Sequence, residues 1–403
     1  MQLSTDSEVI VRATAGVVAD HADEITTLFY RRMFEAHPEL LNVFNRAHQV
    51  QGDQPKALAA SVVAFAVHLI DPDAPDFSPV MRRIAHRHVS LGVSARQYTI
   101  VGRYLLAAVD DVLGEAVTPD VRAAWDEVYW LFGCSLIAEE ARLYAEAGTD
   151  PDHPWRPHRV VERVEEARDV ISLVLEPVDG HRLPHRTGQY VAVAVDLPDG
   201  TRQPRQYTIS SATGSAALRV TVKRVRGSEG VPDGQVSSWL HENAHVGTVL
   251  DVSQPSGDLL LDDSDDALVL ISAGIGITPV AAIVDDLAQR RPERPVHLFH
   301  VDREAETHAL VADVRDRSQR LSDVRTLTWY SASEAEGPAV RSGRMDLADI
   351  ELPQTARVFL CGPLPFMQAI RGTLMARGIA PERIEYEVFG PDRWARQPKS
   401  GAA

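Results

Sequence analysis

One histidine in the first third of the chain has the position of a possible metal ligand. His88 lies on a helical stripe with three apolar residues, Met81, Ile84 and Leu91, so its imidazole faces inward, while neighbouring His86 points elsewhere. An inward imidazole either hydrogen-bonds to the backbone of a core or ligates a metal. This stripe alone leaves both interpretations open.

Other polar side chains fall where packing does not require them. Glu140 lies on the apolar face of the last helix at the i+4 position from Leu136, and a carboxylate there must be paired. Tyr98 heads an apolar stripe, so its hydroxyl also needs a partner. Gln54 stands one turn before Leu58 on an apolar face. The aromatic residues Tyr30 and Phe44 could serve packing alone.

A glycine loop in the last third could bind a diphosphate. The run Ala273-Gly-Ile-Gly-Ile-Thr-Pro279 follows a strand expected at 268–272 and leads into a helix expected to begin near Pro279. Glycines let the backbone approach a diphosphate, and a helix N-terminus supplies positive potential. The run lacks the third glycine of the dinucleotide fingerprint, so the prediction of a diphosphate site depends on the strand before it and the helix after it.

Three stretches of the chain, each with its own hydrophobic periodicity, must position these residues. Residues 1 to about 147 are helical, with helix-start signals at Asp53-Gln54-Pro55, Ser94 to Gln97 and Thr118-Pro119, and Gly148 ends the last helix. A proline-rich linker follows at 149–158.

The two later stretches are built from strands. Short β-branched segments at 170–175, 190–195, 207–210 and 218–223, separated by glycine and proline turns, predict an antiparallel barrel or sandwich. From about Asp266, strands expected at 268–272, 296–301 and 357–361 alternate with helices, which predicts a parallel α/β sheet.

Composition excludes several classes of protein. In 403 residues, 44% are apolar and 24% charged, which fits globular domains. The 41 basic and 57 acidic residues give a net charge of −16, which disfavours nucleic acid and anionic membranes as partners. Cys134 and Cys361 form no metal-ligand spacing, and no signal peptide is evident, so we expect a cytoplasmic protein without stable membrane insertion.

The helical third resembles the globin domain of the flavohaemoglobins. The resemblance rests on LFYRRMFEAHPELLNVFN, on GDQ at 52–54, on RIAHRHVSLGV at 83–93 and on QYTIVGRYLL at 97–106, and it continues to the C-terminus. It implies that His88 is the proximal iron ligand of haem b. It further implies that Tyr98 and Glu140 form a hydrogen-bonded group behind that histidine. Tyr30 and Gln54 would face bound oxygen.

The other two thirds resemble ferredoxin reductase-like modules. Arg205-Gln-Tyr-Thr-Ile-Ser210 is similar to a flavin motif, with Thr208 where serine is usual. Gly188-Gln-Tyr190 matches a flavin turn in which Thr187 replaces the usual proline, so we expect a looser turn. Gly234-Gln-Val-Ser237 is similar to a pyrophosphate-binding segment, and GSEGVP lengthens the loop before it. Val388 stands where cysteine is frequent in relatives.

The resemblance assigns cofactor contacts to many positions. The cofactor-binding residues that it implies are Phe44, Tyr190, Arg205, Gln206, Tyr207, Thr208, Gln235, Val236, Ser237, Gly274, Ile275, Gly276, Ile277, Thr278, Pro279, Cys361, Gly362, Pro363, Val388, Phe389, Gly390 and Pro391. The implied domains are a globin haem domain at 1–148, a linker at 149–158, an antiparallel β-barrel FAD domain at 159–265 and an α/β parallel-sheet NAD(P)-binding domain at 266–403.

The resemblance also implies an activity. We expect an oxidoreductase, a nitric oxide dioxygenase that converts NO and O2 to nitrate with electrons passed from NAD(P)H through FAD to haem. NADH is favoured over NADPH by resemblance, and a monomer is expected. The alternatives are an oxygen or hydroperoxide reductase and, in a different class, a haem-based sensor or carrier of O2 or NO.

Overall fold

The computed structural model describes residues 2–43, 53–74, 76–182, 184–227, 231–334 and 337–389, without the side chains of 53–57 and 59. The chain forms two compact units. The first is built mainly on Met1–Pro154, and the second on Trp155–Leu197 and Arg205–Phe389. Among the described helices, none combines the length and the apolar content needed to cross a membrane.

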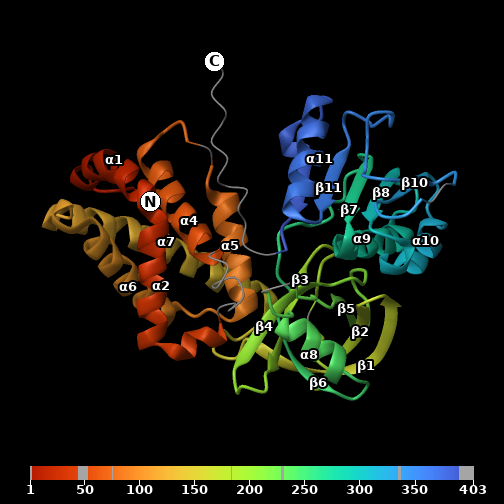
Figure 1. Cartoon of the computed structure of the whole chain (residues 1–403), viewed down its shortest axis with the longest axis horizontal. Coiled ribbons are helices and arrows are strands. Elements are labelled where there is room, and N and C mark those ends of the chain that lie inside the picture. Colours follow the sequence, from red (N-terminus) through yellow and green to blue (C-terminus); the bar gives the residue numbers. More distant parts are fainter. Residues whose placement is uncertain are drawn as a thin grey trace. The chain divides into compact units, whose positions relative to one another are not determined.

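The first unit is all helical (Figure 1). Its long helices are α1 (Thr5–Asp20), α2 (Ala22–Ala36), α4 (Asp53–Ile70), α5 (Ser78–Leu91), α6 (Ala95–Leu113) and α7 (Pro119–Ala147), with short 3₁₀ helices η1 (Pro38–Asn42) and η2 (Gly114–Ala116). Their apolar faces meet in one core that includes Phe29, Met33 and Leu136.

The helix ends follow the capping signals in the sequence. Ser94 and Gln97 form a reciprocal capping box at the start of α6. The Thr118 hydroxyl accepts a hydrogen bond from the Val121 backbone N–H at the start of α7. Gly148 ends α7 in the left-handed conformation, with φ 62°, that glycine adopts without strain. The signals at these three positions are therefore confirmed.

The second unit contains an antiparallel sheet that we call the barrel lobe. Its strands are β1 (Trp155–Ala167), β2 (Val170–Pro177), β3 (Tyr190–Asp196), β4 (Arg202–Thr208), β5 (Leu218–Lys223) and β6 (Val249–Ser253), in the order β4-β3-β6-β1-β2-β5, with helix α8 (Gln235–Asn243). An isolated bridge between Ile209 and Val220 joins the two ends of this order, so the sheet closes on itself.

A parallel sheet, the parallel lobe, completes this unit. Its strands are β7 (Leu268–Ala273), β8 (Val296–Asp302), β9 (Val324–Tyr330), β10 (Val340–Ser342), β11 (Arg357–Cys361) and β12 (Ile384–Glu387), in the order β10-β9-β8-β7-β11-β12. Its helices are α9 (Ile277–Arg290), α10 (Val311–Ser318) and α11 (Leu364–Ala376), and the short 3₁₀ helices of this unit are η3 (Gly274–Gly276), η4 (Ala305–Thr307) and η5 (Pro381–Arg383).

The order of the parallel strands creates a switch point. The chain moves from β7 outward through β8 to β9, and then returns to β11 on the other side of β7. Right-handed crossovers therefore place α9 and α10 on one face of the sheet and α11 on the other (Figure 1). Ligands of open parallel sheets bind where the strand order reverses, beyond the carboxyl ends of the strands. Here that point lies between β7 and β11.

Two predicted strands begin earlier in the structure than expected. The strand expected at 207–210 is β4, which begins at Arg202 and ends at Thr208. Strand β1 begins at Trp155, so the last four residues of the expected linker are extended and pair with β6. The proline and charged residues at the start of β1 do not predict a strand from the sequence. These residues are extended because they pair with a neighbouring strand.

Candidate functional site

A buried polar group lies in the core of the helical unit. The Tyr98 hydroxyl on α6 donates a hydrogen bond to Glu140 Oε1 on α7 at 2.5 Å. His88 Nδ1 on α5 lies 2.8 Å from the same oxygen and 2.9 Å from the Tyr98 hydroxyl. The side chain of Glu140 is only 5% exposed, whereas that of His88 is 29% exposed. The structure therefore brings together three residues singled out in the sequence.

These contacts fix the chemistry of the imidazole. Because Nδ1 is held by the Glu140 carboxylate, Nε2 is the ring nitrogen left to ligate a metal. Burial and then the charge of Glu140 raise the pKa of Tyr98, so its hydroxyl stays protonated and remains a donor. A neutral imidazole with an anionic hydrogen-bond acceptor behind it is a strong iron ligand, so these residues fit a haem.

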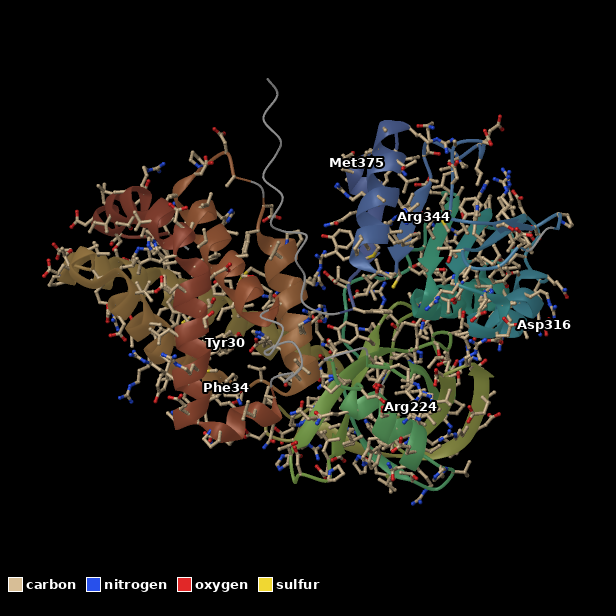
Figure 2. The ribbon with its side chains drawn as sticks, in the orientation of Figure 1. Tyr30, Phe34, Arg224, Asp316, Arg344 and Met375 are labelled. Atoms are coloured by element: carbon tan, nitrogen blue, oxygen red, sulfur yellow. The ribbon has the colours of Figure 1, made fainter. Side chains whose placement is uncertain are left out.

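Tyr30 is buried on α2 in the same core. Its ring packs against Phe29 and stacks on Phe34, with ring centroids 5.6 Å apart for the second pair. Tyr30 and Phe34 are labelled in Figure 2. Burial raises the pKa of Tyr30, so its hydroxyl is a proton donor at neutral pH. Phe44, Gly390, Pro391 and the side chain of Gln54 lie outside the described residues.

The turn before β3 is firmly held. The Thr187 backbone N–H donates to Thr213 Oγ1, and the Thr213 backbone N–H donates to Thr187 Oγ1. The Thr187 hydroxyl also donates to Asp286 Oδ1 at 3.0 Å. The expectation of a looser turn is wrong, because threonine supplies an N–H and a hydroxyl that proline lacks.

Gly188 and Tyr190 complete this turn. Gly188 has φ 103°, and a Cβ there would stand 1.8 Å from the backbone oxygen of Leu259. Tyr190 is buried and exchanges two backbone hydrogen bonds with Ser256. The Gln189 carbonyl accepts from the Ile209 N–H, which links the turn to the segment after β4. The two segments expected to contact flavin are thus neighbours.

The flavin-motif residues lie on β4. Arg205, Gln206 and Tyr207 are half-buried, and Thr208 is buried. Burial raises the pKa of Tyr207, with Arg205 acting in the opposite direction. An arginine and a protonated tyrosine two residues apart on a strand point to the same face and can bind a phosphate and an aromatic ring, respectively.

The segment Gln235-Val236-Ser237 forms the first turn of α8. Ser237 Oγ accepts from the Val225 N–H at 3.1 Å and donates to the Gly234 carbonyl. A Cβ on Gly234 would stand 2.7 Å from Val225 Cβ, so only glycine allows this approach. Gln235 is exposed at the helix N-terminus, where backbone N–H groups favour an anion.

Two loops meet at the switch point of the parallel lobe. Gly274–Gly276 forms a short 3₁₀ turn after β7, and α9 begins at Ile277, two residues before the position expected for it. A Cβ on Gly276 would stand 2.4 Å from the backbone oxygen of Cys361, and one on Gly362 would stand 2.9 Å from Ala273 Cβ. The two glycine-containing loops therefore pack backbone to backbone, where a dinucleotide can lie across both.

The remaining predicted residues border these loops. Thr278 Oγ1 donates to the Ile275 carbonyl at 3.1 Å, and Pro279 lies in the first turn of α9. Pro363 precedes α11. Val388 and Phe389 follow β12, and the Phe389 side chain is exposed.

Lys223 also lies at this site, although no sequence pattern predicts it. This residue ends β5, and its Nζ lies 4.0 Å from the point where a Cβ on Gly274 would stand. Its ammonium therefore lies beside the glycine loop and can neutralise a diphosphate. Lysine is common at strand ends, so its presence in the sequence does not indicate a binding site. Only the contact between the two lobes shows that Lys223 lies beside the glycine loop.

Comparisons with known proteins agree with this geometry. Three family models match in succession: Globin at residues 27–133, Oxidoreductase FAD-binding domain at 157–260 and Oxidoreductase NAD-binding domain at 270–372. The chain is 42% identical to a flavohemoprotein of Chromobacterium violaceum, an alignment that covers 96% of this chain and 98% of the relative. The chain belongs to the flavohaemoprotein family.

Solved structures support the same family assignment for this flavohaemoprotein. The flavohemoglobin of Malassezia yamatoensis with bound FAD and heme superposes with a TM-score of 0.88 at 36% identity, over 97% of this chain and all of that one. The FAD/NAD-binding domain of a nitric oxide dioxygenase from Vibrio cholerae has a TM-score of 0.55 at 34% identity, over 59% of this chain and 99% of that one. This flavohaemoprotein is an oxidoreductase with haem, FAD and NAD as its cofactors.

Proposed function

We propose that this flavohaemoprotein is a nitric oxide dioxygenase that forms nitrate from NO and O2 with electrons from NADH. The observation that carries the proposal is the hydrogen-bonded group of His88, Tyr98 and Glu140. An imidazole backed by a buried carboxylate favours oxygen activation over reversible oxygen storage. The similarity of the second unit to the nitric oxide dioxygenase of Vibrio cholerae supports nitric oxide as the second substrate.

Each residue in the helical unit has a proposed role. His88 would bind haem iron through Nε2, and Glu140 would hold the imidazole through Nδ1. Tyr98 would keep Glu140 in place by donating its hydroxyl proton to Oε1. Tyr30, kept protonated by burial, would donate a hydrogen bond to a ligand in the haem pocket, and Gln54 would assist it.

The second unit would supply electrons to this site. Arg205 would pair with flavin phosphate, and Gly276 and Gly362 would admit the dinucleotide backbone. Haem and FAD supply the redox chemistry, because flavin accepts a hydride and passes on single electrons. One hydride carries two electrons, so two NO molecules are converted per NADH oxidised.

The preference for NADH rests on charge at the end of β8. Asp302 there is buried, and Glu304 and Glu306 follow it. These three carboxylates are accompanied by Arg303 and by Arg168, which forms an ion pair with Glu304. This excess of carboxylates disfavours the additional phosphate of NADPH. We expect the ratio kcat/KM to be higher for NADH than for NADPH, and the reverse ratio would refute this part of the proposal.

The decisive experiment measures NO consumption and nitrate yield with NADH under air. We expect nitrate to account for the NO consumed and Tyr30→Phe to slow the reaction by about tenfold or more. Tyr104→Phe is the matched control, because Tyr104 is a half-buried tyrosine on α6 whose ring packs edge-on against His37. NO loss no faster than without enzyme, or faster NADH oxidation with a hydroperoxide than with NO, would overturn the proposal.

A further inference from the structure

Two neighbouring carboxylates on α9 are buried against the barrel lobe. Asp285 and Asp286 are 4% and 1% exposed. Consecutive residues of a helix point about 100° apart, so the two side chains reach different partners. A buried carboxylate is costly unless it is paired, so contacts must compensate this burial. The contacts of both carboxylates extend into the other lobe.

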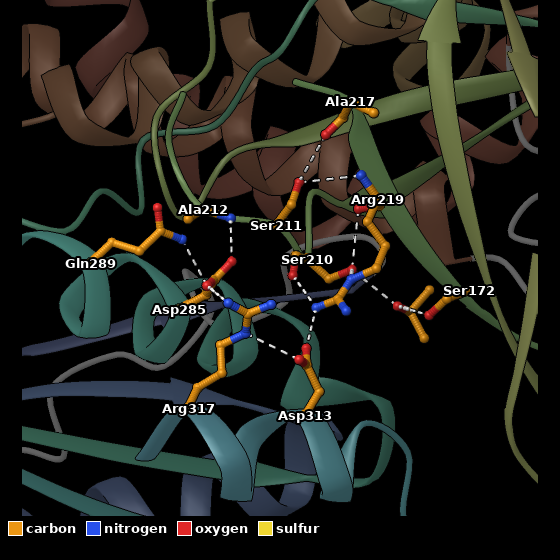
Figure 3. A network of polar contacts seen from close by, with 11 residues as sticks. Ser172, Ser210, Ser211, Ala212, Ala217, Arg219, Asp285, Gln289, Asp313 and Arg317 are labelled. Atoms are coloured by element: carbon orange, nitrogen blue, oxygen red, sulfur yellow. Dashed lines mark hydrogen bonds and ion pairs between the residues drawn. The ribbon is translucent and has the colours of Figure 1, made fainter. Parts of the chain in front are cut away.

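Asp285 belongs to a closed chain of charges (Figure 3). Its Oδ2 accepts from the Ala212 backbone N–H of the barrel lobe at 3.2 Å, and its Oδ1 binds the Arg317 guanidinium on α10. Arg317 Nε donates to Asp313 Oδ1 at 3.1 Å. Asp313 Oδ2 in turn lies 2.7 Å from an Arg219 nitrogen on β5, which returns the chain to the barrel lobe.

Arg219 attaches this chain to the flavin-motif segment. Its Nη2 donates to the Ser210 carbonyl at 2.6 Å, and its Nε donates to Ser210 Oγ at 3.1 Å. Burial opposes the ionisation of Asp313, but Arg219 and Arg317 outweigh it and hold the pKa of that carboxyl below its usual value. Ser210 ends the segment that carries Arg205 and Tyr207, so the charge chain holds the end of that segment.

Asp286 forms a separate link to the flavin turn. Its Oδ1 accepts from the Thr187 hydroxyl, and its Oδ2 accepts from Arg290 Nε at 3.0 Å. Thr187 immediately precedes Gly188 and is itself held by Thr213. The link exists because this chain has threonine at a position where the resembling family usually has proline.

We propose that these contacts are positioning devices that set the nicotinamide against the flavin for hydride transfer. Helix α9 begins at Ile277, directly after the glycine loop at 274–276. Along this helix, Asp286 contacts the turn at 187–190 directly. Asp285 is linked to the segment at 205–210 by way of Arg317, Asp313 and Arg219. Hydride transfer depends steeply on the separation and alignment of donor and acceptor carbons. Buried polar networks of this kind specify geometry more than they stabilise.

The test separates positioning from nucleotide binding. Arg219→Gln removes the guanidinium that joins Asp313 to Ser210. Thr187→Val removes the hydroxyl that contacts Asp286 and Thr213 while retaining the side-chain shape. We measure anaerobic reduction of the bound FAD by NADH in a stopped-flow spectrometer with the full-length holoprotein. The maximal rate should fall about ten- to a hundredfold in each variant, as expected for a misplacement of about 1 Å. The NADH concentration for half-maximal rate should stay within about twofold, because the nucleotide loops are untouched.

Two controls make the result specific. Thr187→Ser retains the hydroxyl and should restore the rate of Thr187→Val to near that of the unmodified protein. Arg315→Gln removes an exposed ion pair with Asp316 on the same helix α10 and should leave the rate unchanged. Hydrogen exchange gives a readout independent of turnover: the Ala212 amide, which donates to Asp285, should exchange at least about tenfold faster in Arg219→Gln.

Several outcomes would overturn the proposal. These are an unchanged maximal rate in both variants, a rise in the half-maximal NADH concentration without a fall in maximal rate, and loss of FAD from both variants. The last would mean that the network retains flavin instead of orienting it. The assay contains no NO, so a protein that failed as a nitric oxide dioxygenase would still test this inference.

Discussion

Replacing Tyr98 by phenylalanine tests the buried group behind His88. The substitution removes the hydroxyl that donates to Glu140 Oε1 at 2.5 Å but retains the aromatic ring. Glu140 keeps its contact with His88 Nδ1 at 2.8 Å, so one of the two bonds to Oε1 is lost. A hydrogen bond to a charged group contributes about 1.5–3 kcal/mol to stability. We therefore expect Tyr98→Phe to destabilise the helical unit by about 2 kcal/mol.

The loss is large enough to measure in the full-length protein. For a unit of roughly 150–250 residues, 1 kcal/mol lowers Tm by about 2–4 °C, so the variant should melt about 4–8 °C lower. The assay follows haem absorbance and far-ultraviolet circular dichroism during heating. Tyr104→Phe on the same helix provides the control and should shift Tm by less than about 2 °C.

The pH dependence of the same variant has a definite sign. Burial raises the pKa of Tyr98 above its ordinary value of 10.0. Above that pH the unfolded chain ionises at this tyrosine while the folded chain does not, so stability is lost as pH rises. Tyr98→Phe should therefore flatten the alkaline decline of stability. A Tm equal to that of Tyr104→Phe, together with an unchanged alkaline decline, would refute the proposed hydrogen bond.

Three other substitutions test the second unit. Gly276→Ala places a Cβ 2.4 Å from the Cys361 carbonyl oxygen. It should slow NADH-dependent flavin reduction by at least about tenfold, while FAD content, measured by absorbance, stays unchanged. An unaltered rate would contradict the close packing of the two loops. Gly188→Ala combines a φ of 103° with a clash against the Leu259 carbonyl oxygen. The purified protein should therefore lose FAD or melt at least about 5 °C lower. A variant with full FAD content and normal Tm would show that the turn does not require glycine. Burial opposes ionisation of Asp262, but two arginines outweigh it and lower its pKa. This carboxylate therefore stabilises the folded chain above pH ~4, and the effect is lost as pH falls. Asp262→Asn should reduce the loss of stability at acid pH measured by urea unfolding, and an identical loss in variant and unmodified protein would be evidence against the pairing.

Local chemistry made the element boundaries predictable. The capping residues Ser94 and Thr118 and the terminal Gly148 act within one helical turn, so their effect can be read without knowing the fold. The strand starts at Val170 and Leu218 follow from β-branched runs flanked by turns. The sequence predicts the start of strand β1 four residues too late, at Arg159 instead of Trp155, because its first residues are extended only through pairing with β6.

Periodicity located the site residues but not all of their partners. It placed Glu140 and Tyr98 on apolar faces, and a buried carboxylate or phenol requires a partner whatever the fold. Only the crossing of α5, α6 and α7 makes these two residues and His88 share one oxygen atom. The burial of His86 likewise depends on neighbouring helices, which a single-helix stripe does not reveal.

The sequence by itself determined which residues could form helices, strands and glycine loops, because these depend on interactions a few residues apart. It also carried the motifs by which the family can be recognised. The tertiary structure alone decided that Thr187 tightens its turn and that Asp285 and Asp286 join the two lobes. Lys223 reaches the glycine loop for the same kind of reason. Such contacts join residues up to about a hundred positions apart, and their geometry exists only when the chain is folded.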